Sequence, residues 1–365
     1  MSHSFDQLET PFVAIDLDVV ENNIKTMQDR AAERRLTVRP HTKTHKQPFL
    51  ARKQFNRGAT SLTVAKLDEA EVMLQAGFSD LLIAYPLVGA AKAYRLATLM
   101  VRGLRPTVSI DSLVSMRTLS QAAALAQRPI NVLVEVDTGF HRCGLTGSAV
   151  IELADAIHNE PGLTFQGLMS FAGHIAGNTD RAVIRRIIRD EDEQMAQYRK
   201  NLESRHLAVE TVSVGGTILS HNMDVIEHAT EIRPGIYIFN DMGIVYSGSV
   251  KIEQCAARIW ATVVSQPAEN RAVLDAGSKM LSTDGPLKGA YGYVVGFPGW
   301  TIARLSEEHA VVEIAPEAPR PEIGDRVSII PNHICTVMNL QNNVVGVENG
   351  QVTAILPIMS RGGTH

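Results

Sequence analysis

Eight short segments rich in β-branched and apolar residues recur along the first two thirds of the chain, and stretches with helical spacing of apolar residues separate most of them. This alternation predicts parallel strands joined by helices, and eight repeats favour a closed (β/α)8 barrel, or TIM barrel, over an open doubly wound sheet. Periodicity does not report closure, so the open sheet stays an alternative. The predicted strands are residues 36–41, 61–66, 81–86, 106–111, 130–137, 165–170, 211–216 and 231–239, and the clearest helices are 68–77, 90–103, 112–127 and 185–205.

The character of the sequence changes after Val245. The segments that follow are short, rich in β-formers and separated by Pro, Gly, Asn or Asp, with no clear amphipathic helix among them. They predict an all-β C-terminal domain of about 120 residues. We expect the opening strand, residues 11–16, to join this domain. The predicted division is therefore a barrel over 17–244 and a β domain formed by 1–16 plus 245–365.

Charge and composition narrow the class of partner. The chain of 365 residues has 35 Lys and Arg against 39 Asp and Glu, a net charge of −4 that gives no basic surface for nucleic acid or anionic lipid. The N-terminus lacks a signal-peptide pattern, and no uncharged run reaches the roughly 18 residues of a membrane helix. Three widely spaced cysteines suit a reducing compartment. We expect a cytoplasmic protein with a small-molecule ligand, without nucleic acid or membrane partners.

Basic residues crowd the end of the first predicted barrel strand. The segment RPHTKTHK, residues 39–46, includes Lys43 between His41 and His45. Taken alone, the string fits a solvated basic turn. In a barrel, however, reactive residues gather at the carboxyl ends of the strands. Nearby cations there favour the neutral amine that a lysine needs to form a Schiff base.

Several motifs along the chain resemble those of one enzyme family. The lysine segment after an N-terminal PFVAID strand resembles the D-threonine aldolases and D-serine dehydratases, which are pyridoxal-phosphate (PLP) enzymes of the alanine racemase-like fold. The resemblance implies that Lys43 carries PLP and is catalytic, that the substrate is a D-amino acid, and that the protein is a homodimer. The matching motifs are PHTKTHK (40–46), VEVDTGFHRCGL (134–145), GLMSFAGH (167–174), VSVGGT (212–217), EIRPGIYIFND (231–241), LDAGSKMLSTD (274–284) and PNHICTVMNL (331–340).

Four of the matching residues are candidate PLP contacts on chemical grounds. Arg142 follows a strand and offers a fixed cation to the phenolate oxygen of PLP or to the substrate carboxylate. Gly215 and Gly216 open a predicted helix, so their backbone N–H groups can approach a phosphate, and Thr217 adds a hydroxyl. The simpler interpretation of Arg142 is a surface arginine, and a lone GGT string is a weak phosphate signal.

Two further residues follow from the same resemblance. Tyr237 lies in the segment predicted as strand eight and is a candidate PLP contact, with packing against the barrel wall as the alternative. His174 ends strand six and is a candidate catalytic base, with a buried structural histidine as the alternative. The family often has Tyr where Phe171 stands.

A separate pair predicts a metal site. His333 and Cys335 are two residues apart, so on a strand both side chains would face one side. Such a pair alone is weak support, but the family binds a divalent metal through an HxC or HxD element. Two protein ligands are too few for a closed structural zinc site, which leaves positions for water and substrate. The thiolate favours Zn²⁺, whereas Mn²⁺ prefers oxygen.

Together these residues predict a lyase acting on D-β-hydroxy-α-amino acids. PLP accepts electrons from a bond broken at Cα, and a metal beside the β-hydroxyl lowers its pKa. Removal of the hydroxyl proton leads to retro-aldol cleavage, as of D-threonine to glycine and acetaldehyde, which we favour because the C-terminal segment resembles the aldolases. Removal of the Cα proton leads to a D-serine or D-3-hydroxyaspartate dehydratase. An amino-acid racemase, a non-catalytic PLP carrier and a phosphate-binding barrel without PLP are further alternatives.

Overall fold

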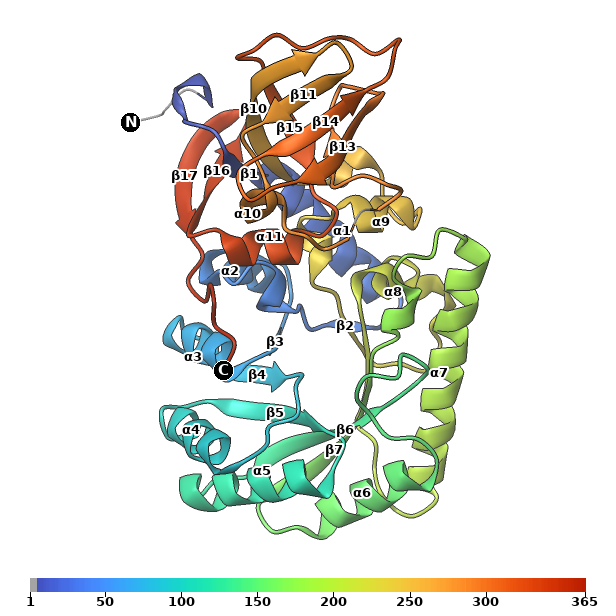
Figure 1. Ribbon diagram of the computed structural model, residues 1–365. Coiled ribbons are helices and arrows are strands. Elements are labelled where there is room, and N and C mark those ends of the chain that lie inside the picture. Colours follow the sequence, from blue (N-terminus) through green and yellow to red (C-terminus); the bar gives the residue numbers. More distant parts are fainter. Residues whose placement is uncertain (1–4, 286) are drawn as a thin grey trace. The chain divides into compact units, whose positions relative to one another are not determined.

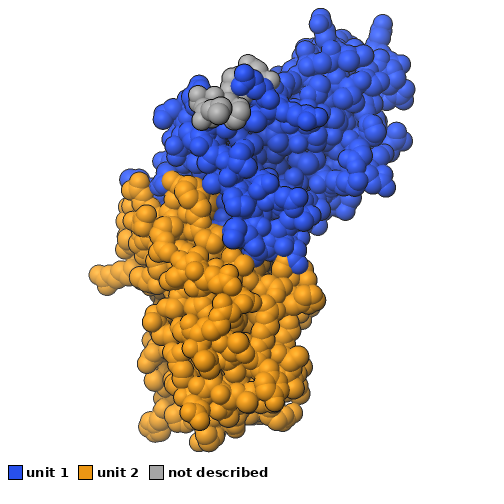
Figure 2. All heavy atoms as spheres, turned by 90° about the vertical axis from the view of Figure 1, so that its left-hand side faces the viewer, with its two compact units in different colours: residues 1–25, 44–47, 236–362 blue, residues 26–43, 48–235, 363–365 orange. Residues whose placement is uncertain are grey.

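The structure, a computed structural model, describes residues 5–285 and 287–365 of the chain. The chain forms two compact units (Figures 1 and 2). One, here the β unit, contains residues 1–25, 44–47 and 236–362, and the other, here the barrel unit, contains residues 26–43, 48–235 and 363–365. This division differs in detail from the predicted domains 17–244 and 1–16 plus 245–365, which we keep as a proposal.

The barrel unit is built on eight parallel strands in the order β2-β9-β8-β7-β6-β5-β4-β3. A parallel bridge between His41 and Thr63 connects the two ends of this order, and the Thr63 N–H donates to the Pro40 carbonyl at 2.8 Å. The predicted (β/α)8 fold is therefore confirmed, and the alternative of an open doubly wound sheet is rejected. The strands are β2 (Thr37–Val38), β3 (Leu62–Val64), β4 (Asp80–Ile83), β5 (Arg105–Ile110), β6 (Ile130–Val136), β7 (Leu163–Ser170), β8 (Thr211–Gly215) and β9 (Glu231–Arg233).

Helices alternate with these strands, as the periodicity predicts, and Figure 1 shows α4 to α7 outside the strands. Local sequence sets several helix starts: the Ser112 side chain caps α5 by accepting from Ser115 N–H, and Asp180 caps α7 by accepting from Ala182 N–H. The helices are α1 (Leu17–Glu33), α2 (Pro48–Asn56), α3 (Leu67–Gln75), α4 (Ala90–Val101), α5 (Leu113–Ala126), α6 (Ser148–Asn159), α7 (Arg181–Glu203) and α8 (Thr217–His221). Within the described residues, no helix combines the length and the apolar character needed to span a lipid bilayer.

The β unit contains nine strands in one sheet, whose main path runs β13-β14-β11-β10-β1-β16-β17. Strand β1 pairs antiparallel with β10 and parallel with β16, which confirms that the opening strand joins this sheet. Buried and partly exposed residues alternate along the first part of β10, as expected of a half-buried strand. The strands are β1 (Phe12–Asp16), β10 (Ala257–Ala268), β11 (Arg271–Leu274), β12 (Tyr293–Val294), β13 (Trp300–Leu305), β14 (Ala310–Ile314), β15 (Arg326–Ile330), β16 (Asn343–Glu348) and β17 (Gln351–Pro357).

The C-terminal domain is mostly strand, in agreement with the predicted fold class, and it also contains the short helices α9 (Met242–Tyr246), α10 (Ser278–Leu281) and α11 (Ile334–Leu340). One local prediction was wrong. The segment 231–239 is not one strand: β9 ends at Arg233 and residues Ile236–Ile238 form a 3₁₀ turn. Pro234 has no N–H to continue the ladder, which explains the early end of β9.

Candidate functional site

Lys43 lies just beyond the end of β2, in the 3₁₀ turn Thr42–Thr44. The residues on either side are buried, whereas Lys43 itself is exposed. Two hydrogen bonds hold the turn to the barrel: the His41 N–H donates to the Pro234 carbonyl at 2.9 Å, and the Thr42 hydroxyl donates to the Thr63 carbonyl at 3.1 Å. The fold therefore presents Lys43 at the carboxyl-terminal rim of the barrel on a fixed backbone.

Phe171, directly after β7, is the centre of the predicted PLP contacts at this rim. Its ring meets that of Phe140 edge-on at 5.5 Å, and the Arg142 guanidinium carbon lies 5.0 Å from the Phe171 centroid and 5.1 Å from that of Phe140. Contacts of this kind orient a guanidinium without neutralising it. Arg142 also lies 4.0 Å from the buried carboxylate of Glu135, although half of its side chain is exposed.

The two glycines after β8 pack against the same ring. A Cβ atom on Gly216 would lie 3.3 Å from Phe171, and one on Gly215 would lie 3.0 Å from Phe171 and 2.7 Å from the Arg233 guanidinium. Gly216 also has a φ of 103°, which favours glycine. Thr217 begins α8 and is buried. A side chain at position 215 would require Arg233 or Phe171 to shift, and the Gly216 N–H donates to the Arg233 carbonyl at 3.4 Å.

His174 lies in the 3₁₀ turn Gly173–Ile175 at the same rim. A Cβ on Gly139 would lie 3.5 Å from the imidazole, so the ring sits beside the loop after β6. Its Nδ1 atom is buried and has no hydrogen-bond partner within the described part of the chain. A buried polar atom without a partner calls for an explanation, and a bound ligand is one. The barrel unit thus brings Arg142, Gly215 and Gly216 together around Phe171, with His174 beside Gly139 at the same rim.

Charged residues that the motifs did not single out lie beneath this rim, inside the barrel. Arg233 donates to the Ser213 hydroxyl and to the Ser170 carbonyl, both at 2.6 Å, and Ser213 donates to Glu231 at 2.5 Å. Arg39 donates to the same Glu231 carboxylate at 2.6 Å. Burial lowers the pKa of Arg233 to about 10, although neighbouring glutamates oppose the shift. The guanidinium therefore stays charged and is held in one orientation.

Two buried glutamates complete this network. Burial raises the pKa of Glu135, against a hydrogen bond from Ser109 at 3.1 Å and the nearby arginines. Burial also raises the pKa of Glu191 to about 7, against a 2.6 Å hydrogen bond from the Ser170 hydroxyl. The sequence did carry a signal for most of this network, because Ser109, Glu135, Ser213 and Glu231 are polar residues within predicted strands, where a packed barrel has branched aliphatic ones.

In the β unit, His333 and Cys335 are close, but not in the way predicted. They do not lie on a strand: His333 is the N-cap residue of α11, and Cys335 is in its first turn. The His333 Nδ1 atom is hydrogen-bonded to Asp284 Oδ2, and the Cys335 sulfur lies 3.2 Å from the Thr44 hydroxyl. Thr44 is the residue directly after Lys43. A histidine nitrogen and a sulfur form a donor set that suits zinc.

The backbone between the two candidate ligands is also fixed. The Asp241 carboxylate accepts from the Ile334 N–H and from the Ile244 N–H, each at 3.1 Å, and burial raises its pKa to about 6. Burial opposes protonation of His333, but Cys335, Asp241 and Asp284 outweigh it and raise the pKa of His333 to about 10. No group of three or more His, Cys, Asp or Glu side chains within residues 5–285 and 287–365 is arranged to hold a metal. His333 and Cys335 therefore stay a pair of candidate ligands.

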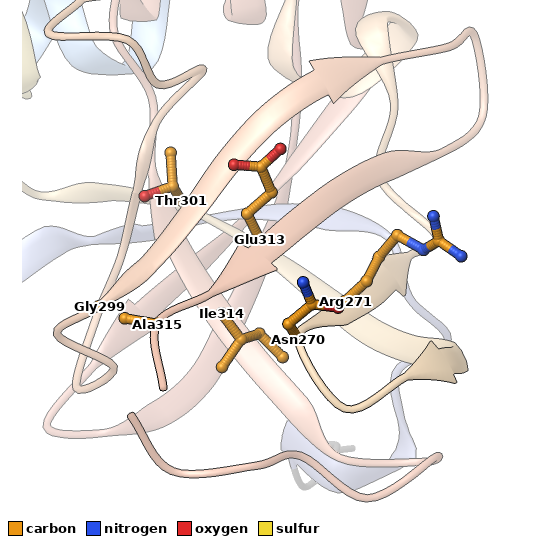
Figure 3. Close-up of a pocket in the computed structure, with 7 residues that line it drawn as sticks. All are labelled: Asn270, Arg271, Gly299, Thr301, Glu313, Ile314 and Ala315. Carbon is orange, nitrogen blue, oxygen red and sulfur yellow. The ribbon is translucent and has the colours of Figure 1, made fainter. Parts of the chain in front are cut away.

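The remaining sequence candidates are placed as follows. Tyr237 lies in the 3₁₀ turn after β9, not on a strand, and is 2% exposed within the β unit. All three cysteines are free thiols, and burial raises the pKa of Cys143 and, to about 12, that of Cys255. A cavity of about 380 Å³ in the β unit is lined by none of the predicted site residues (Figure 3). Its lining residues are Asn270, Arg271, Gly299, Thr301, Glu313, Ile314 and Ala315.

Comparison with known proteins places this geometry in a family. Residues 15–242 match the model of the alanine racemase N-terminal domain, and residues 256–347 match that of a putative serine dehydratase domain. The chain is 33% identical over 361 residues to a D-threonine aldolase of an Arthrobacter species, covering 98% of this chain and 93% of that protein. It belongs to the family of D-threonine aldolases and D-serine dehydratases.

Other members of the D-threonine aldolase and D-serine dehydratase family show a range of activities. A 3-hydroxy-D-aspartate aldolase of Paracoccus denitrificans is 32% identical over 371 residues, covering 98% of this chain and 93% of that protein. A D-threo-3-hydroxyaspartate dehydratase of a Delftia species is 28% identical over 348 residues, covering 90% of this chain and 91% of that protein. These relatives are lyases, and they include both aldolases and dehydratases.

Solved structures agree with the family assignment. The D-threonine aldolase of Filomicrobium marinum superposes with a TM-score of 0.93 at 31% identity, covering 100% of this chain and 99% of that chain. A D-threo-3-hydroxyaspartate dehydratase has been solved as two variants at 26% identity to this chain. The histidine-to-alanine variant has a TM-score of 0.88 and covers 98% of this chain and 97% of that chain. The cysteine-to-alanine variant, substituted two positions later, has a TM-score of 0.89 and covers 97% of this chain and 99% of that chain. The cysteine variant is described as a metal-free form.

Proposed function

We propose that the protein is a PLP- and divalent-metal-dependent lyase that cleaves D-β-hydroxy-α-amino acids by a retro-aldol reaction, as D-threonine to glycine and acetaldehyde. The observation that carries the proposal is the packing of Arg142, Gly215 and Gly216 around Phe171, with His174 beside Gly139, on the barrel rim that also presents Lys43. Family membership adds the cofactor, because members of the alanine racemase-like fold are PLP enzymes.

The rim residues fit PLP on two structural grounds. Gly215 and Gly216 place no side chain over the start of α8, and His174 Nδ1 is a buried polar atom that lacks a partner in the described structure. When bound, PLP supplies an electron sink for a bond broken at Cα. Lys43 would hold it through its amine, and Arg142 would bind its phenolate oxygen or the substrate carboxylate. Gly215, Gly216 and Thr217 would bind its phosphate, and Tyr237 is kept as a further proposed contact.

His333 and Cys335 fit a divalent metal by the chemistry of their donors. Their spacing equals that of the substituted histidine and cysteine in the two dehydratase variants. Zinc is the metal that an imidazole and a thiolate favour, with manganese as the alternative. A bound ion would act as a Lewis acid on the substrate β-hydroxyl.

His174 is the residue that we assign as the base. It would accept the proton of the β-hydroxyl, the Cα–Cβ bond would break, and the Cβ fragment would leave as an aldehyde while Cα is later protonated to give glycine. If instead Lys43, displaced from the cofactor by the substrate amine, took the Cα proton, hydroxide would depart from Cβ. Hydrolysis of the resulting enamine by water would then give a 2-oxo acid and ammonia. The second outcome is that of a D-serine or D-3-hydroxyaspartate dehydratase. We retain this alternative because the chain is similar to the Delftia dehydratase. A racemase or a non-catalytic PLP carrier would leave the His333–Cys335 pair without a role. A homodimer and a cytoplasmic location complete the proposal.

Product analysis with D-threonine and D-serine, each with and without a chelator, tests this proposal. We expect glycine and acetaldehyde from D-threonine, lost on chelation and restored by zinc or manganese. A 2-oxo acid with ammonia would establish the dehydratase, and chelator-resistant turnover would refute the metal role. Lys43→Ala is the control for the cofactor, because it should remove the visible absorbance band of lysine-bound PLP together with the activity. An unchanged spectrum in this variant would refute the assignment of Lys43.

A further inference from the structure

The loop after α10 runs along the segment that carries His333 and Cys335. Three side-chain interactions join the two: Asn332 donates to the Gly285 carbonyl at 3.0 Å, His333 Nδ1 is bonded to Asp284 Oδ2, and the Thr336 hydroxyl donates to that of Ser282 at 3.0 Å. Asn332 also donates to the Ala290 carbonyl at 2.8 Å. Because Ser282 and Gly285 are held by these hydrogen bonds, Asp284 between them is the loop residue that faces the His333 imidazole.

We propose that Asp284 is a positioning residue that prepares His333 to bind the metal. The inference rests on the metal-dependent function proposed above. A metal that binds His333 must displace one ring proton, and the hydrogen bond to the carboxylate keeps the proton on Nδ1, so the lone pair that becomes free is on Nε2. Asp284 therefore selects Nε2 as the metal-binding atom and fixes the plane of the ring. The carboxylate also makes the ring a more basic ligand.

The sulfur ligand has its own support. The Thr44 hydroxyl lies 3.2 Å from the Cys335 sulfur, and Asp241 holds the Ile334 N–H between the two ligands at 3.1 Å. Both ligands are thus oriented by contacts made without a metal. With only two protein ligands, the entropy cost of ordering them takes a large share of the binding free energy, so the orientation of His333 matters more than it would in a four-ligand site.

The nearby pair Lys279–Glu308 shows what an ordinary surface ion pair looks like in this unit. Its side chains are 65% and 62% exposed, against 39% and 49% for His333 and Asp284. Glu308 touches none of the candidate ligands in the interactions described. Replacing Glu308 therefore removes a carboxylate from the same unit without touching His333, and it provides a matched control.

Zinc affinity of the purified full-length protein, measured by competition with a chromophoric chelator, tests the proposal without using activity. We expect Asp284→Ala to weaken zinc binding about 10- to 100-fold, the usual cost of losing such a supporting carboxylate. Asp284→Asn should lose less, because its amide oxygen still accepts the Nδ1–H. Glu308→Ala should bind zinc as the wild-type protein does. Circular dichroism of each variant confirms that the chain is folded, and Asp284→Asn keeps the size of the side chain if the alanine variant is not.

The outcomes separate this inference from the proposed function. Wild-type zinc affinity in both folded Asp284 variants would overturn the positioning role. Zinc affinity that is equally unaffected by His333→Ala would overturn the metal site and the positioning role together. Tight zinc binding that depends on His333 and Asp284, in a protein that cleaves no D-β-hydroxy amino acid, would leave the inference standing and refute the lyase. Nitrogen NMR of the zinc-bound protein supplies a second readout: coordination through Nδ1 of His333 would contradict the assignment of Nε2.

Discussion

Gly215→Ala is the substitution that most directly tests the geometry of the barrel rim. The added methyl group would lie 2.7 Å from Arg233 Nη2 and 3.0 Å from Phe171 Cδ2. Ordinary contact begins at 3.4 Å, so Arg233 must retreat by about 0.7 Å. The guanidinium has little freedom to do so, because it is buried and donates two hydrogen bonds of 2.6 Å.

The magnitude follows from these distances. A retreat along the bond to the Ser170 carbonyl would stretch it from 2.6 Å to about 3.3 Å, beyond the range of good N–H···O bonds. Losing a hydrogen bond to a charged group costs about 1.5–3 kcal/mol, and overpacking a core costs a similar amount. We take about 2 kcal/mol for the free energy of unfolding, which lowers the melting temperature of a chain of this size by roughly 3 °C. The same loss at the PLP contacts would weaken cofactor binding about 30-fold.

Two measurements check these values. Thermal unfolding of the cofactor-free protein reports the packing cost, and titration with PLP followed by absorbance reports the cofactor contacts. Gly346→Ala in β16 is the control, because its added methyl would meet only side-chain carbons, the nearest being 3.2 Å away on Leu17. If Gly215→Ala melts and binds PLP as the wild-type protein does, then Arg233 and Phe171 do not confine this position, and the described rim geometry is refuted.

Two other substitutions test separate parts of the molecule. The pKa of Glu191 is raised to about 7 from an ordinary value near 4.5, so its contribution to stability is present at low pH and is lost as pH rises through about 7. In thermal melts between pH 5 and pH 8, Glu191→Gln should therefore lose less stability than the wild-type protein as pH rises. A loss of the same size in the variant would contradict the prediction. Thr44→Val keeps a β-branched side chain but removes the hydroxyl 3.2 Å from the Cys335 sulfur. It should weaken zinc binding about 2- to 10-fold in a chelator competition, in line with one hydrogen bond, and unchanged affinity would remove Thr44 from the site.

Local sequence patterns predicted the secondary structure well where the spacing of apolar residues along one strand or helix determines it. The eight barrel strands and the helices between them follow from periodicity, because alternation and helical spacing record which side of each element is buried. One failure has a local cause, because Pro234 ends β9 earlier than its β-branched residues suggest. The other does not: the HxC pair begins a helix instead of continuing a strand, and the Ile334 N–H donates to Asp241, which is 93 positions away.

The candidate site was predictable only in part. The motifs placed Lys43, Arg142, His174 and Gly215 at strand ends, and a barrel brings strand ends to one rim. They did not reveal that Phe171 is the ring around which the other side chains of the rim are arranged, since its contacts with Phe140 and Gly216 join loops after three different strands. These loops follow β6, β7 and β8, which are neighbours in the sheet, but which side chains meet above them depends on how the loops pack in the folded chain.

The sequence by itself determined the fold class and the family and supplied the candidate reactive groups that we propose, because these depend on residue types at short, regular spacings. Tertiary structure alone decided how those groups are supported. His333 meets Asp284 across 49 positions, Arg233 meets Ser170 across 63, and Cys335 meets Thr44 across 291. No local pattern encodes such pairs, since each depends on packing that forms only when distant segments fold together. The orientation of each ligand, and with it the chemistry that the site performs, is therefore set by the folded chain.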